Sequence, residues 1–143
     1  TLNDESFLAA IDLVPSLLKI AGVQPPESVQ FDGVEMSAVL LGQSTASRGK
    51  PLFFRRPPDR DAFYGEDDLP DLCVREGRWK FLCEYDGSDA QLYDLSTDRE
   101  ETNNVIVAHE EIAKQLREKL LAWHKAMPAD NGASYRAAQR KGK

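Results

Sequence analysis

The sequence has 143 residues, of which 41% are hydrophobic, and it carries 24 acidic side chains against 18 lysines and arginines. A chain of this length buries enough surface to form one core. Its net charge of -6 disfavours nucleic-acid binding, which needs a basic face that neutralises phosphates. Its apolar runs are far shorter than the roughly 20 residues that span a bilayer, so we expect no membrane span.

A helix is predicted near the start of the chain, within the segment FLAAIDLVPSLLKIAGV at residues 7–23. Asp12 is placed to act as the N-cap of a helix that begins at Leu13, and Pro15 falls in its first turn, where a missing N–H costs little. Gly22 is a natural C-terminal stop.

The next stretch predicts a short helix, a brief strand and a long irregular segment. Apolar side chains within residues 36–41 suggest a helical turn that Gly42 closes, and residues 51–54 suggest a buried strand. Residues 55–70, RRPPDRDAFYGEDDLP, combine prolines with charged clusters that exclude regular structure. Connections of this length are often functional or mobile.

Three further strands are predicted as an antiparallel meander. Residues 72–75 and 79–85 flank a tight turn that contains Gly77, and a second turn leads into residues 91–95. The sequence around residues 97–101 fits a reciprocal capping box, which predicts a short helical turn there.

The strongest helix prediction covers residues 109–127, where apolar side chains recur at spacings of three and four and Pro128 follows. The expected fold is α+β, a small antiparallel sheet packed against this long C-terminal helix. The predicted core comprises Leu72, Val74, Trp79, Phe81, Leu92, Leu95, Ile112, Leu116, Leu120 and Trp123.

Neither the cysteines nor the histidines form a recognisable reactive centre. Cys73 and Cys83 lack the close spacing of zinc ligands, and we favour two free buried thiols over a cross-strand disulfide. His109 and His124 lie on one predicted helix, roughly 22 Å apart, so they cannot ligate one metal, and we expect both to be solvated.

The acidic residues of the irregular segment also fit no metal-binding pattern. Glu66, Asp67 and Asp68 form a run, with further aspartates nearby that include Asp71, but the run lacks the alternating ligands and glycine of a calcium loop. We therefore favour a solvated acidic loop. The sequence contains no G-x-S-x-G, G-x-G-x-x-G or P-loop motif. The residues by themselves predict no catalytic and no metal-binding site.

Six fragments of the chain stand in the order found in one known family. They are IDLVPSLL with AGV (11–23), FDG with LLG (31–42), PLFF (51–54), VREGRWKF (74–81), QLYDL with Asp98, Glu101 and Asn104, and W-x-x-x-x-P (123–128). Together they resemble the formylglycine-dependent sulfatases, especially the arylsulfatase A and N-acetylgalactosamine-6-sulfatase branch. Arg99 stands where that family has proline.

The resemblance implies that the chain is the C-terminal portion of a sulfatase. Residues 1–50 would then be a helical segment continuing from a missing N-terminal catalytic domain, residues 51–128 the C-terminal subdomain, and residues 129–143 a basic, disordered tail. It also implies calcium, a formylglycine and a periplasmic or secreted location. The formylglycine motif C/S-x-P-x-R is absent here, because neither Cys73 nor Cys83 has the required proline and arginine.

The resemblance further implies partners and a substrate pocket. The partners are the chain's own catalytic domain and a sulfated carbohydrate or aryl sulfate. We expect residues 55–70 to shape the pocket, with Arg55 and Arg56 contacting sulfate or carboxylate groups and Tyr64 stacking on a sugar ring. The competing interpretation is a solvated loop with structural arginines.

Other functions stay open at this point. The parent could be a phosphatase or phosphonate hydrolase of the alkaline-phosphatase superfamily, or the chain could be a stand-alone interaction module. An apolar patch along Leu13, Leu17 and Leu18, if uncovered, would favour self-association.

Overall fold

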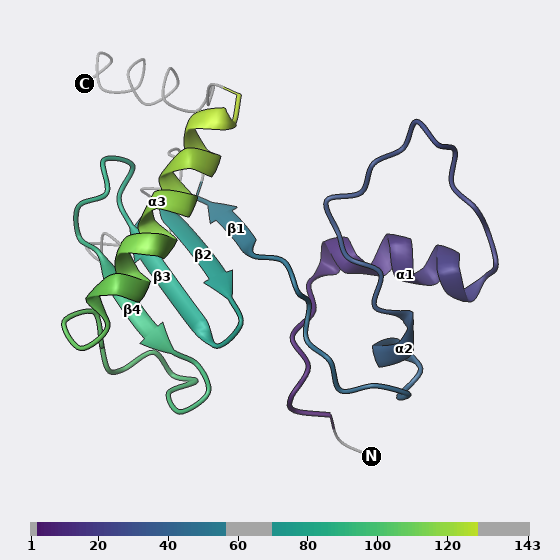
Figure 1. Cartoon of the computed structure of the whole chain (residues 1–143), viewed down its shortest axis with the longest axis horizontal. Helices are drawn as coiled ribbons and strands as arrows, with labels where there is room; N and C mark the ends of the chain where they lie inside the picture. Colours follow the sequence, from purple (N-terminus) through teal and green to yellow (C-terminus); the bar gives the residue numbers. More distant parts are fainter. Residues whose placement is uncertain (1–2, 57–69, 129–143) are drawn as a thin grey trace, which may run out of the picture. The chain divides into compact units, whose positions relative to one another are not determined.

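The computed structural model describes residues 3–56 and 70–128. The chain divides into a first unit, Thr1–Leu52, and a second unit, Phe53–Lys143, which are described separately. The first unit contains η1 (Ala10–Asp12), α1 (Leu13–Ile20) and α2 (Ser37–Leu40), joined by long connections (Figure 1). The predicted helix start and the short helix before Gly42 are thus both present.

Asp12 organises the first unit, although not as the N-cap that the sequence suggested. Its backbone is already helical, and its side chain makes no cap hydrogen bond to α1. Its carboxylate instead accepts hydrogen bonds from the backbone N–H of Ala9 and of Val34, both at 2.7 Å, and lies 3.4 Å from Nη2 of Arg48. Asp12 is only 1% exposed, so it joins three separate segments inside the unit.

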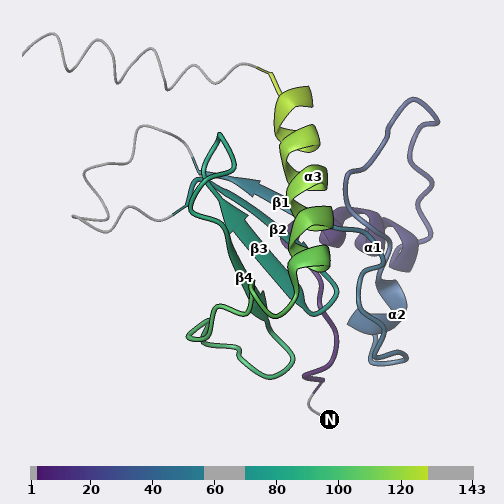
Figure 2. The same cartoon turned by 60° about the vertical axis from the view of Figure 1, so that its left-hand side comes forward.

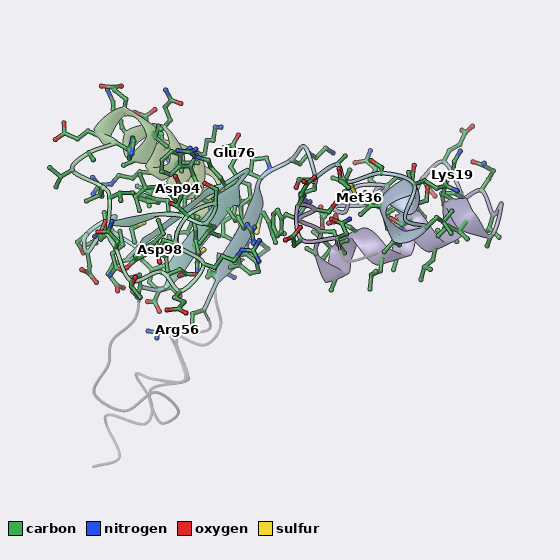
Figure 3. All side chains as sticks on the ribbon, turned by 90° about the horizontal axis from the view of Figure 1, so that it is seen from below. Lys19, Met36, Arg56, Glu76, Asp94 and Asp98 are labelled. Atoms are coloured by element: carbon green, nitrogen blue, oxygen red, sulfur yellow. The ribbon has the colours of Figure 1, made fainter. Side chains whose placement is uncertain are left out.

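Two further contacts fix the connection between α1 and α2. The hydroxyl of Ser16 donates to the carbonyl of Asp12 and accepts a 2.7 Å hydrogen bond from the N–H of Met36, a buried residue that Figure 3 labels. Gly33 passes so close to the α1 entry that a Cβ there would lie 2.0 Å from the carbonyl oxygen of Ile11. Only glycine fits this backbone approach.

The second unit is built on a four-stranded antiparallel sheet in the order β1-β2-β3-β4. Its strands are β1 (Leu52–Arg55), which begins at the boundary, β2 (Leu72–Glu76), β3 (Trp79–Cys83) and β4 (Gln91–Asp94). The register places Val74, Phe81 and Leu92 side by side across three strands. Because side chains alternate along a strand, one face of the sheet is apolar and buried.

The helix α3 (Glu110–Ala126) lies along that buried face (Figure 2). Its apolar stripe packs against the sheet in the core. Each large apolar side chain that is fully buried there stabilises the folded state by about 1.5–3 kcal/mol. The predicted α+β fold is therefore confirmed. The core consists of Leu72, Val74, Phe81, Cys83, Leu92, Ala113, Leu116 and Leu120.

Some predicted core residues lie at its margin. Trp79, Ile112 and Trp123 are partly buried and pack against the core, whereas Leu95 is half-buried and outside this cluster. Strand β4 ends at Asp94, before Leu95, so the backbone turns there and does not continue the alternation.

The capping box expected near residues 97–101 is wrong, because that stretch forms turns and no helix. Asp98 instead accepts hydrogen bonds from the N–H groups of Thr102 and Asn103, at 3.2 and 2.9 Å. The amide oxygen of Asn104 accepts from the N–H of Leu92 and of Ile106, both at 3.1 Å. These motif residues hold a loop against β4.

No helix within residues 3–56 and 70–128 is long and apolar enough to cross a membrane.

The close approach at Gly33 gives a testable stability difference. Gly33→Ala should destabilise the 143-residue chain by about 1–3 kcal/mol, because a backbone carbonyl blocks the added methyl group. Gly49→Ala is the matched control, since no atom lies within 4 Å of a Cβ at that position. Urea unfolding followed by circular dichroism compares the two, and equal stability of both variants would contradict this packing.

Candidate functional site

The candidate site lies where β1 ends and β2 begins, in the second unit. Arg55, at the end of β1, is half-buried, and its Nη1 donates to the carbonyl of Pro128 at 3.4 Å. Arg56 follows directly and is labelled at the rim of the unit in Figure 3. Tyr64, the third residue predicted for the substrate pocket, lies outside the described residues.

Arg56 is held by both its backbone and its side chain. Its N–H donates to the carbonyl of Asp71 at 2.8 Å, and its Nε donates to Oδ1 of Asp71 at 3.0 Å. The Asp71 side chain is 9% exposed and that of Arg56 is 21% exposed. The hydroxyl of Tyr85 donates to the carbonyl of Arg56 at 2.8 Å.

Aromatic stacking supports this cluster from the side of α3. The rings of Tyr85 and His124 stack with centroids 4.9 Å apart, and those of Phe53 and Trp123 stack at 5.2 Å.

The expectation that both histidines are solvated is wrong, because both are half-buried against aromatic rings. His109 packs at a tilt on Trp79, with centroids 4.8 Å apart.

Sequence reasoning missed the residues that hold Arg56. The sequence pattern places Asp71 in a solvated acidic loop, but Asp71 is 8% exposed and paired with an arginine. The rest of that acidic run, Glu66 to Asp68, lies outside the described residues. A usable signal was the position of Asp71 immediately before an apolar strand, where a lone charge needs a partner.

Guanidinium groups present planar, forked donors that match sulfate and carboxylate, and Arg56 directs one of these donors, Nε, at Asp71. Within residues 3–56 and 70–128, no three His, Cys, Asp or Glu side chains lie close enough together to hold a metal ion.

The cysteines face opposite sides of the sheet and are both free thiols. The register pairs Cys83 with Leu72 on the buried face and Cys73 with Leu82 on the other face. A cross-strand disulfide is thereby excluded, and the alternative of two free thiols is confirmed. Burial raises the pKa of each thiol to about 11, which disfavours the nucleophilic thiolate.

Comparison with known proteins defines the class of the chain as the C-terminal domain of a sulfatase. Residues 1–126 match the protein family described as N-sulphoglucosamine sulphohydrolase, C-terminal. The chain belongs to this family, and the resemblance to sulfatases is confirmed.

Several curated relatives share this region, among them the following two sulfatases. Arylsulfatase K of Mus musculus is 32% identical over 124 residues, which are 83% of this chain and 22% of the relative. N-acetylgalactosamine-6-O-sulfatase of Bacteroides thetaiotaomicron is 28% identical over 133 residues, covering 82% and 24%. The chain thus spans less than a quarter of the length of these relatives.

Several solved structures share the fold, among them the following two. One is a protein in complex with its substrate D-glucosamine-2-N,6-O-disulfate, with a TM-score of 0.54, 21% identity, and coverage of 80% of this chain and 23% of that one. The other is the phosphonate monoester hydrolase of Agrobacterium radiobacter, with a TM-score of 0.51, 24% identity, and coverage of 84% and 25%. Similarity at this level establishes the fold alone.

The raised pKa of both thiols predicts slow alkylation and alkaline destabilisation. At pH 8 the folded chain should hold roughly a hundredfold less thiolate than the unfolded chain, whose thiols have the ordinary value of 9.0. The pKa of each thiol is higher in the folded chain than in the unfolded chain. Each protonated thiol therefore makes its full contribution to the free energy of unfolding below pH 9, and this contribution is lost as the pH rises towards 11.

Iodoacetamide labelling in buffer and in urea measures this difference, and Cys73→Ser separates the two thiols. Equal labelling rates in the folded and the unfolded chain would contradict the burial.

Proposed function

We propose that the chain is the C-terminal part of a sulfatase that hydrolyses the sulfate ester of a sulfated carbohydrate or an aryl sulfate. The observation that carries this proposal is the family match over residues 1–126, supported by 32% identity to an arylsulfatase. Since the chain covers less than a quarter of such relatives, we assign the bond-breaking chemistry to the rest of the full-length protein.

The residues present here do not fit the two catalytic groups of formylglycine-dependent sulfatases. Neither cysteine stands in a C/S-x-P-x-R motif, and both thiols are free and buried or half-buried. No group of candidate metal ligands exists among the described side chains. We therefore place calcium and formylglycine outside this chain and assign it no catalytic step.

The exposed face of α1 supports the proposal that residues 1–50 continue the catalytic domain. Six large apolar side chains on and around this helix are between 39% and 55% exposed. They are Ile11, Leu13, Val14, Leu17, Ile20 and Val23. An apolar row of this kind normally contacts a partner, and the remainder of the same polypeptide is the partner we propose. A chain produced without it should self-associate through the same row.

Residues 51–128 would then support the fold and line the substrate cleft. Arg55 and Arg56 have the chemistry to bind a sulfate or carboxylate group of the sugar, and they stand next to each other at the end of β1. Arg56 keeps part of its side chain accessible despite its contacts with Asp71. Tyr64 stays a proposed stacking residue of the same pocket.

The phosphonate monoester hydrolase that shares the fold keeps a second function open. In that case the full-length protein would cleave phosphonate or phosphate esters, and the C-terminal unit would have the same supporting role. A stand-alone interaction module is the third alternative, and it predicts no hydrolase domain in the same reading frame.

The proposed reaction predicts that the full-length protein hydrolyses 4-nitrophenyl sulfate or a sulfated sugar with a higher kcat/KM than the matching phosphate or phosphonate esters. Release of nitrophenol or of sulfate, measured for each ester at equal concentration, checks this. Preferred cleavage of a phosphonate monoester would select the second function, and a reading frame without a hydrolase domain would select the third.

The proposed substrate contact predicts that Arg55→Ala and Arg56→Ala in the full-length protein each lower kcat/KM for a sulfated sugar. A charge-assisted hydrogen bond of about 1.5–3 kcal/mol corresponds to a loss of roughly ten- to hundredfold. Arg78→Ala is the control, because Arg78 is exposed and pairs with Asp94 at 2.8 Å, at a different place on the sheet. An unchanged kcat/KM in both variants would contradict the proposal that these arginines contact the substrate.

A further inference from the structure

We draw no further inference here: the strongest candidate, the mainly apolar pocket of about 210 Å³ that Phe81, Ala90, Ile106 and Ala113 line beside the start of α3, is rimmed by the exposed side chains of Glu110, Lys114 and Arg117, and nothing in the part of the chain that the structure describes shows what covers it.

Discussion

The alternation of side chains across β2, β3 and β4 is the constraint on which the second unit depends. One face of these strands is apolar, and α3 covers it, so the sheet acquires a fixed orientation relative to the helix. A shift of one residue in any strand would turn its apolar set to the wrong face. The sheet thereby fixes where β1 ends and β2 begins, which is where Arg56 and Asp71 meet.

Several residues that mark the family by sequence serve the architecture and not the chemistry. Asp12 joins three segments through its buried carboxylate, and Gly33 allows one of those segments to pass over the start of α1. Asn104 ties its loop to β4 with one amide oxygen. A short motif of polar residues is therefore weak evidence for a reactive site when each side chain satisfies backbone N–H groups.

Local sequence patterns predict the helices and strands of this fold well. They do not predict the polar contacts between residues that are far apart in the sequence. The period of α3 and the alternation of the strands are properties of neighbouring residues, so the sequence alone indicates them. The sequence pattern indicates that Asp12 caps the nearest helix, whereas one of its partners is Val34, 22 positions away. The pattern places Asp71 in an acidic loop, whereas its partner is Arg56, 15 positions away. Such pairings depend on the tertiary fold, which brings distant segments together, and a short stretch of sequence carries no information about them.

The two cysteines illustrate a practical consequence of strand parity. Positions 73 and 83 differ by an even number of residues, yet the tight turn between β2 and β3 places their side chains on opposite faces of the sheet. No oxidant can join them within one folded molecule, whatever the redox state of its surroundings. The covalent structure of the folded unit should accordingly be the same whether the protein is made in a reducing cytosol or passed through an oxidising compartment.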